Sequence, residues 1–159
     1  MFIKPDYNLK NIYEIDFQEL KKQGIKCVMF DLDSTVMMSK SASFTEKTLD
    51  WFKTFINDFN VVIISNNHNK NYIENASKLA PCRVIGSAGK PNPKITKRFL
   101  DEAGIKPVEA VMVGDRPLTD ILCGKNLGCK TILVDSITAD TESKIVRFVR
   151  WLERLSIKK

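Results

Sequence analysis

Short, largely apolar runs recur along the chain, and polar residues follow directly after each of them. Stretches of this length, rich in Val and Ile, are typical of strands that are buried on both faces of a sheet. We therefore predict a sheet of about five strands. They lie at residues Cys27–Phe30, Val61–Ile64, Arg83–Gly86, Ala110–Val113 and Thr131–Val134.

The segments between these runs carry apolar residues at helical spacing, which predicts one helix between successive strands. Both ends of the helix predicted over Lys94–Ala103 are marked clearly, because Pro93 would stand in its first turn and Gly104 just past its last residue. Ser43 or Thr45 could cap an earlier helix. The predicted helices are Asp16–Lys22, Thr45–Asp58, about Asn69–Leu79, Lys94–Ala103 and a segment ending near Leu127. Alternating strands and helices indicate right-handed crossovers and a parallel sheet between two helical layers, a three-layer Rossmann-like α/β fold.

The 159 residues predict a single domain, because no internal repeat or linker divides them. We expect a leading arm over residues 1–24, a core over 25–135 and a C-terminal amphipathic helix over about 140–157. The last segment places apolar residues on one helical face and arginines on the other. Such a helix either packs on its own domain or lies on an anionic membrane.

Polar residues after parallel strands should gather at one edge of the sheet, where α/β proteins bind ligands. The first predicted strand runs straight into Asp31 and Asp33, and Thr35 follows. Two carboxylates this close repel each other unless a cation lies between them, and their hard oxygens suit Mg²⁺. One carboxylate could then attack a substrate while the other handles a proton. The alternative is an acidic turn that only caps the next helix.

Four polar clusters, in this order and spacing, resemble the motifs of the haloacid dehalogenase (HAD) superfamily of phosphohydrolases over about residues 25–135. They are Asp31-x-Asp33-x-Thr35-Val36, Ser65 after a strand, Lys90, and Gly114-Asp115-x-x-x-x-Asp120. The Lys90-Pro91 pair, the ending of the fourth motif and the small size resemble the YqeG-type group of subfamily IIIA, which is related to phosphatidylglycerophosphate phosphatases.

This resemblance implies a Mg²⁺-dependent phosphomonoesterase. Asp31 would be the nucleophile that forms an aspartyl-phosphate, and Asp33 the general acid and base. Asp31, the backbone carbonyl of Asp33, Asp115 and Asp120 would hold the metal, the last two directly or through water. Ser65 and Lys90 would be catalytic and would bind the phosphoryl group, together with Thr35 and Asn66.

Several of these residues have plainer interpretations. Ser65 and Asp120 could each cap a helix. Lys94 could replace Lys90 as the phosphate partner, and Arg116 could meet either a second anionic group or a surface carboxylate. Asn67 and His68 stand near the same edge, either as substrate contacts or in a solvent-exposed loop.

Charge and composition limit the classes of partner that the protein could bind. A net charge of +6 and a pI near 9.1 favour anionic partners. No apolar run reaches the roughly 20 residues needed to span a bilayer, and no secretory signal begins the sequence. We therefore expect a cytoplasmic protein, with peripheral contact at the inner face of the membrane as an open alternative. The single histidine excludes a multi-histidine metal site, and the spacing of the four cysteines favours buried free thiols.

The spacing of the motifs leaves no room for a large cap domain. Only about 30 residues separate Asp33 from Ser65 and about 25 separate Ser65 from Lys90, and one helix and one strand nearly fill each interval. An open site favours a bulky phosphorylated substrate. Among such substrates, the resemblance to the YqeG-type group implies phosphatidylglycerophosphate as the leading candidate. Two alternatives remain: a phosphatase of a small metabolite or phosphoprotein, and a catalytically idle scaffold that binds RNA, ribosome or protein. Clustered like charges argue against the scaffold, and nucleic acid is a disfavoured partner.

Overall fold

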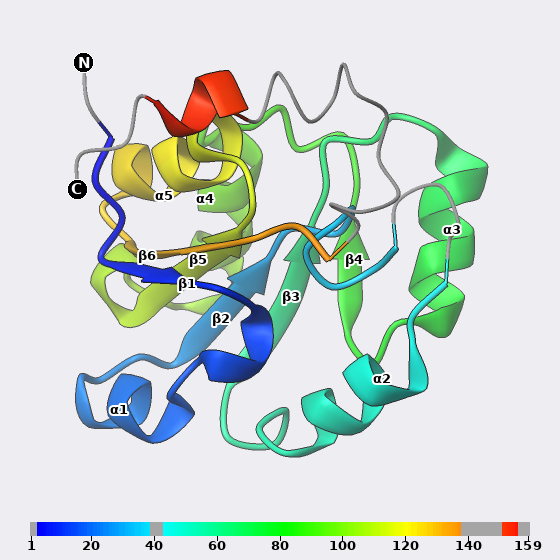
Figure 1. The fold of residues 1–159 in the computed structure, drawn as a ribbon, viewed down its shortest axis with the longest axis horizontal. Coiled ribbons are helices and arrows are strands. Elements are labelled where there is room, and N and C mark those ends of the chain that lie inside the picture. Colours follow the sequence, from blue (N-terminus) through cyan, green and yellow to red (C-terminus); the bar gives the residue numbers. More distant parts are fainter. Residues whose placement is uncertain (1–2, 39–42, 138–150, 156–159) are drawn as a thin grey trace.

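The computed structural model describes residues 3–38, 43–137 and 151–155, and its centre is a parallel sheet of six strands (Figure 1). The strand order is β1-β6-β5-β2-β3-β4. The strands are β1 (Tyr7–Leu9), β2 (Cys27–Phe30), β3 (Asn60–Ile64), β4 (Arg83–Ile85), β5 (Ala110–Gly114) and β6 (Lys130–Val134). All five predicted strands are confirmed. The sixth strand, β1, comes from the leading arm.

Asp6 attaches this arm to the far edge of the sheet. Its carboxylate accepts hydrogen bonds from the backbone N–H and the hydroxyl of Thr131, at 2.8 and 3.1 Å. Lys125 lies 3.4 Å from the same carboxylate oxygen. β1 then pairs with β6 in register from Tyr7 opposite Ile132 to Leu9 opposite Val134.

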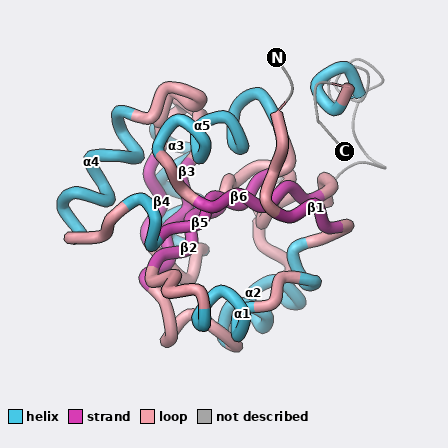
Figure 2. Tube along the Cα trace, turned by 90° about the vertical axis from the view of Figure 1, so that its left-hand side faces the viewer, coloured by secondary structure: helices cyan, strands magenta, loops and turns pink. Residues whose placement is uncertain are grey.

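Successive residues of the central strands point to opposite faces of the sheet and build two hydrophobic cores. In β2, Val28 and Phe30 enter one core, whereas Cys27 and Met29 enter the other. The first core lies under α1 (Phe17–Lys22), α2 (Glu46–Lys53) and α3 (Lys70–Leu79), and the second under α4 (Lys94–Ala103). Figure 2 shows α1 and α2 on the side of the sheet opposite to α4 and α5 (Leu122–Leu127). This is the predicted three-layer arrangement.

Two of the predicted helix ends are set by local capping chemistry, whereas α2 ends at Lys53 rather than at the predicted Asp58. Thr45, rather than Ser43, caps α2 by accepting a hydrogen bond from the Thr48 backbone N–H. α4 spans the predicted residues, and Gly104 ends it in the left-handed conformation with φ of 70°. The four cysteines are free, as expected, and three of them are buried.

Connections at the carboxyl ends of the strands are short. Residues 31–45 join β2 to α2, and β3 reaches β4 through α3 alone. The described part of the chain therefore contains no large cap domain. Within the described ranges, no helix is long and apolar enough to cross a membrane. Most of the C-terminal helix expected over about 140–157 lies outside the described residues, although residues 151–154 are helical.

Candidate active site

Three carboxylates converge at the carboxyl edge of the sheet. Asp31 follows β2, Asp115 follows β5, and Asp120 belongs to a π-helical turn, η3 (Pro117–Ile121). One oxygen from each lies within 4.8 Å of the others. β2 and β5 are neighbours in register, and the Asp31 backbone N–H donates to the Val113 carbonyl at 2.9 Å. The strand pairing therefore brings together acidic residues that are far apart in the sequence.

Lys90 is buried among these carboxylates. Its Nζ donates to Asp31 Oδ1, Asp120 Oδ1 and the Ile64 carbonyl, each at 2.7 Å. Burial lowers the pKa of Lys90, but Asp120 and Asp31 outweigh it and raise that pKa above its usual value. The ammonium is therefore charged, and its three N–H bonds are all used. Lys94 is exposed at the start of α4, so the structure brings Lys90 rather than Lys94 to the carboxylates.

Asn66 fixes the backbone of Lys90. Its amide donates to the Lys90 carbonyl and accepts from the Lys90 N–H, both at 2.8 Å. Ser65, the preceding residue, is also linked to this loop, because its carbonyl accepts from Ala88 N–H at 3.0 Å. The end of β3 therefore positions the loop that carries Lys90.

Ser65 and Thr35, both expected at the phosphoryl site, are buried. The Ser65 hydroxyl accepts from the Asn67 backbone N–H at 3.1 Å. The Thr35 hydroxyl lies 3.1 Å from Asp115 Oδ1 and 3.4 Å from Asp31 Oδ2, and it donates toward both. Thr35 therefore holds two of the carboxylates at a fixed separation.

Asp33 lies outside the group of three carboxylates and is partly buried. Its Oδ1 accepts a short hydrogen bond from the Tyr72 hydroxyl on α3. Burial raises the pKa of Asp33, although Tyr72 and Lys90 partly oppose the shift. The sequence did not single out Tyr72, because nothing local distinguishes it from other apolar positions of a helix.

Asp120 is completely enclosed. Its Oδ2 accepts from the Arg116 backbone N–H at 3.1 Å, and its Oδ1 accepts from Lys90. Burial and the charge of Asp31 raise the pKa of Asp120 above its usual value, although Lys90 opposes the shift. The Asp120 carboxylate is thus held between Lys90 and a backbone donor rather than capping a helix with its side chain.

Arg116 forms an ion pair with Glu153, which settles the two interpretations of that arginine in favour of a carboxylate. Its Nη2 lies 2.7 Å from Glu153 Oε1 and its Nε lies 3.2 Å from Oε2. Glu153 is buried, at 7% exposure, and belongs to the helical residues 151–154. Glu153, in the C-terminal segment, therefore holds Arg116, the residue that follows Asp115. Sequence reasoning missed Glu153 because the contact joins segments 37 residues apart.

Gly114 has no side chain, and this leaves space for the side chain of Asp120. A Cβ at Gly114 would overlap the Asp120 side chain. We expect Gly114→Ala to displace this carboxylate and lower kcat by about 100-fold, since misplacement by about 1 Å is enough for such a loss. Gly124→Ala is the matched control, because its Cβ would meet Thr131 at 2.6 Å and Met112 at 3.0 Å in the core.

The control should lose about 1–3 kcal/mol of stability through overpacking but keep its turnover per folded molecule. Phosphate release and thermal unfolding measured side by side separate the two effects. Equal kcat in the two variants would show that Asp120 does not depend on Gly114.

Glu153 gives a second prediction. Glu153→Gln removes the charge that holds Arg116, so we expect the free energy of unfolding to fall by about 1–3 kcal/mol and kcat by about tenfold. Asp135→Asn is the control, because Asp135 pairs with Arg154 at 3.2 Å beside the same helical turn but is 58% exposed. This exposed pair should contribute under about 1 kcal/mol. If both variants lose the same activity, the contact between Glu153 and Arg116 does not position the site.

The three carboxylates fit a divalent cation. Asp31, Asp115 and Asp120 carry a formal charge of about −3, and Lys90 offsets only one unit of it. The ligand atoms that these three residues offer are carboxylate oxygens, which Mg²⁺ prefers to nitrogen or sulfur. Asp31 is the accessible member, since its side chain is 14% exposed whereas those of Lys90 and Asp120 are each 1% exposed. The arrangement can therefore present one accessible carboxylate, paired with Lys90, to a ligand.

Comparison with known proteins identifies relatives along the chain. Residues 87–145, less than half of it, match the HAD-hydrolase-like family model. The chain is 32% identical to the probable phosphatase YqeG of Bacillus subtilis, over 96% of its own length and 88% of that protein. It is 27% identical to phosphatidylglycerophosphate phosphatase 1 of Arabidopsis thaliana, over 99% of its own length and 48% of the plant protein.

Solved structures share the fold. A HAD family enzyme of Bacteroides thetaiotaomicron, crystallised with magnesium and inorganic phosphate, superposes with a TM-score of 0.58 at 15% identity. The superposition covers 79% of this chain and all of that one. The three-layer core of this chain therefore has the fold of that structure.

Proposed function

Since the chain belongs to the HAD superfamily of phosphatases, in its YqeG-type group, we propose that it hydrolyses phosphate monoesters with Mg²⁺ through an aspartyl-phosphate on Asp31. One observation carries this proposal. Asp31 is the accessible carboxylate of a buried charged cluster, and Lys90 holds one of its oxygens at 2.7 Å. A cation beside an accessible carboxylate reduces its repulsion of a phosphate dianion, which is the first requirement of the reaction.

The proposed reaction has two steps, in which Asp31 is the nucleophile and Asp33 transfers the protons. An Asp31 oxygen attacks phosphorus, the bond from phosphorus to the alcohol oxygen breaks, and Asp33 donates a proton to the departing alkoxide. Asp33 then takes a proton from water, which attacks phosphorus and releases inorganic phosphate with Asp31 restored. The raised pKa of Asp33 supports the first of these roles, because it favours the protonated form. Tyr72 fixes the direction of the Asp33 carboxyl.

Asp31, Asp115, Asp120 and the backbone carbonyl of Asp33 are the proposed Mg²⁺ ligands, with Asp115 and Asp120 acting directly or through water. When bound, Mg²⁺ supplies positive charge that offsets the developing negative charge on the phosphoryl oxygens. The phosphoryl group is proposed to be bound by Ser65, Asn66, Thr35 and Lys90. The contacts of Asn66 and Thr35 favour an indirect role for both. Asn66 holds the Lys90 backbone in place, and Thr35 holds the carboxylates in place.

Phosphatidylglycerophosphate is the proposed substrate. The carboxyl edge carries no large cap, so a bulky molecule can reach Asp31, and an open site depends on its substrate to exclude water. Similarity along the whole chain to the plant phosphatase supports the same choice.

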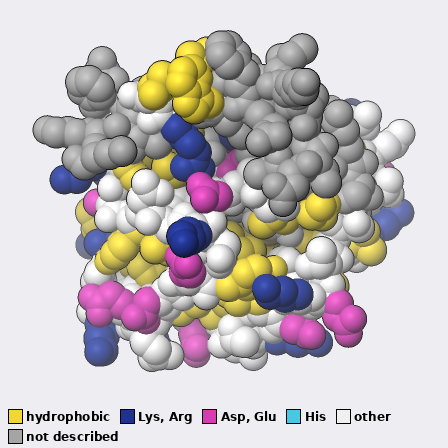
Figure 3. Space-filling model, viewed as in Figure 1, with side chains coloured by type: hydrophobic (Ala, Val, Ile, Leu, Met, Phe, Trp, Pro, Cys, Tyr) yellow, Lys and Arg dark blue, Asp and Glu magenta, His cyan; other side chains and the backbone are white. Residues whose placement is uncertain are grey.

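Exposed apolar residues next to this edge fit a membrane-bound substrate. Trp151, Leu152 and Leu155 are 56%, 46% and 58% exposed. They form the hydrophobic group at the top of Figure 3, over the segment drawn in red in Figure 1. Glu153, between them, holds Arg116 beside Asp115. With a net charge of +6, the protein is expected to bind an anionic membrane through this group and to bring the catalytic edge near the lipid phosphates.

Vesicle binding tests this surface. We expect Leu152→Ser combined with Leu155→Ser to weaken cosedimentation with vesicles that contain anionic phosphatidylglycerol by about tenfold, since two large apolar groups leave the interface. Turnover of a water-soluble phosphate monoester should not change. The exposed pair Val108→Ser and Leu79→Ser, at 70% and 52% exposure on other elements, is the control. Equal vesicle binding by the two double variants would contradict the proposed surface.

A substrate panel tests the function itself. Purified protein is incubated with phosphatidylglycerophosphate in micelles, a nucleotide, a sugar phosphate, a phosphoprotein and p-nitrophenyl phosphate, each with Mg²⁺ and with EDTA. The expected result is Mg²⁺-dependent phosphate release that is fastest with the lipid and slow with p-nitrophenyl phosphate. Rapid turnover of a soluble metabolite alone would reject the lipid substrate. No turnover of any phosphate would support the scaffold alternative.

A further inference from the structure

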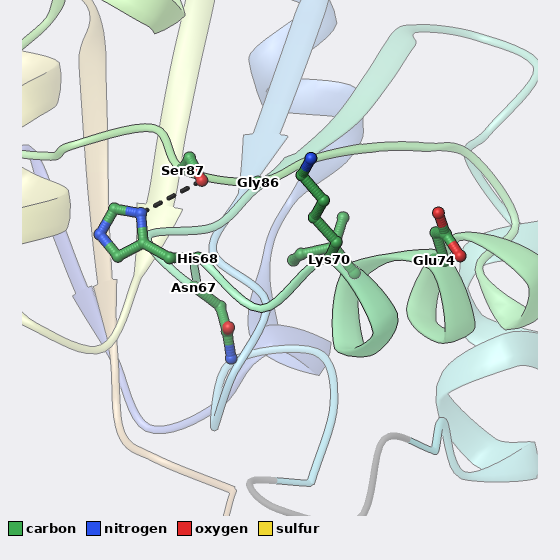
Figure 4. Close-up of a pocket in the computed structure, with 7 residues that line it drawn as sticks. Asn67, His68, Lys70, Glu74, Gly86 and Ser87 are labelled. Atoms are coloured by element: carbon green, nitrogen blue, oxygen red, sulfur yellow. Dashed lines mark hydrogen bonds between the residues drawn. The ribbon is translucent and has the colours of Figure 1, made fainter.

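A second polar pocket borders the candidate active site. Its volume is about 240 Å³. It is lined by Asn67, His68, Lys70, Ile73, Glu74, Gly86 and Ser87 (Figure 4). These residues come from the end of β3, the first turns of α3 and the end of β4. None of them belongs to the carboxylate cluster.

The pocket and the candidate active site share one turn of the chain. Ser65 and Asn66 face the Lys90 loop, and the next two residues, Asn67 and His68, line the pocket. The Asn67 N–H donates to the Ser65 hydroxyl at 3.1 Å. Since consecutive Cα atoms are about 3.8 Å apart, Asn67 and Ser65 are at most about 8 Å apart. A molecule whose phosphoryl group is bound by Ser65 can therefore reach the pocket with a short chain of atoms.

The wall of the pocket is held in place before any ligand binds. The Ser87 N–H donates to the Asn67 carbonyl at 2.9 Å, and the Ser87 hydroxyl lies 3.1 Å from His68 Nδ1. Ser87 has a φ of 52°, which a residue other than glycine rarely adopts. Such a conformation persists when its surroundings impose it, and such residues concentrate at binding sites.

One end of the pocket gathers hydrogen-bond donors. Lys70 supplies an ammonium, and among the ion pairs formed within the described ranges none involves Lys70. The His68 ring and the Ser87 hydroxyl complete this end, whereas the Asn67 side chain points away from them and accepts from the Asn69 N–H at 2.8 Å (Figure 4). Glu74 is the acidic member of the lining, and Figure 4 shows it farther along α3, on the side of Lys70 away from His68. Negative charge is therefore favoured at the His68 end.

We propose that this pocket binds a second phosphate group, carried by the alcohol part of the substrate, with Lys70, His68 and Ser87 as its contacts. The inference rests on the proposed phosphatase function and narrows its substrate class. The substrate is a phosphate monoester whose alcohol bears another phosphate a few atoms away. The phosphodiester of a phosphoglycerol head group has this chemistry, and so has a soluble bisphosphate.

Two synthetic esters that differ in one group provide the test. Propane-1,3-diol bisphosphate carries the second phosphate, and 3-hydroxypropyl phosphate lacks it. We expect kcat/KM with Mg²⁺ to be about tenfold higher for the bisphosphate, the effect of one charge-assisted contact. Lys70→Gln should abolish that preference without changing turnover of 3-hydroxypropyl phosphate, and Lys70→Arg should retain it. Lys78→Gln is the control for net charge, because Lys78 is exposed near the end of the same helix.

The outcomes separate the two proposals. If wild-type protein hydrolyses both esters equally well, or if Lys70→Gln and Lys78→Gln lose the preference equally, the second phosphate site is wrong and the phosphatase remains. If neither ester nor the lipid is hydrolysed, the proposed function fails and the site fails with it. A third probe, the deacylated head group of phosphatidylglycerophosphate, distinguishes the sources. A preference for it over the bisphosphate assigns the pocket to a lipid phosphodiester, and the reverse assigns it to a soluble bisphosphate.

Discussion

Asp31→Asn should reduce phosphate release by about 10⁴-fold or more while the protein stays folded. The amide cannot act as the nucleophile, and so no aspartyl-phosphate forms. The fold should not suffer, because the substitution removes one of three carboxylates whose oxygens lie within 4.8 Å of one another. We expect the midpoint of thermal unfolding without metal to stay equal or rise, since less like charge is brought together.

The measurement is phosphate release with Mg²⁺, together with acid-quenched labelling of the protein by a ³²P-phosphate ester. Asp101→Asn is the control, because Asp101 is an exposed aspartate that pairs with Lys97 at 2.9 Å on the surface of α4. It should keep both activity and label. Substantial turnover by the Asp31→Asn protein would show that another group attacks phosphorus.

Lys90→Met should cost both stability and activity. Lys90 Nζ pairs with two carboxylates, each at 2.7 Å, and its side chain is 1% exposed. Its removal leaves Asp31 and Asp120 close together without their shared cation, and breaking a buried pair costs about 3–5 kcal/mol. Activity should fall by at least about 100-fold, because Asp31 loses a hydrogen bond and charge compensation at the same time.

Mg²⁺ should restore part of the lost stability of this variant, because a ligand that binds only the folded state raises its free energy of unfolding. The measurement is chemical denaturation with Mg²⁺ and with EDTA. Lys94→Met is the matched control, because Lys94 is four residues away and exposed, and it should change stability by less than about 0.5 kcal/mol. If the two variants have equal stability, Lys90 does not hold the carboxylates in solution.

Strands and helix ends could be predicted because they depend on neighbouring residues. The run from Cys27 to Phe30 is apolar and breaks at Asp31, and the structure places Asp31 directly after β2. Gly104 ends α4 for an equally local reason, its tolerance of a positive φ. β1 escaped prediction because it depends on its pairing with β6 and on the contacts of Asp6 with Thr131, which lie far away in the sequence.

The acidic residues of the candidate site, and their partners Lys90 and Thr35, were found from spacing and from the family resemblance, but two other contacts were not. Tyr72 contacts Asp33 across 39 residues, and Glu153 contacts Arg116 across 37. The second polar pocket also joins β3 to β4 through Asn67 and Ser87. Nothing in the local sequence marks any of these contacts.

By itself, the sequence determined which residues end strands and which of those ends carry carboxylates, because hydrophobic pattern and turn chemistry act over a few residues. Only the tertiary structure decided that Lys90 lies between Asp31 and Asp120, and that Glu153 braces Arg116. Those contacts follow from the strand order and from the packing of helices on the sheet. Both depend on the whole chain closing around its two cores, which no single segment specifies.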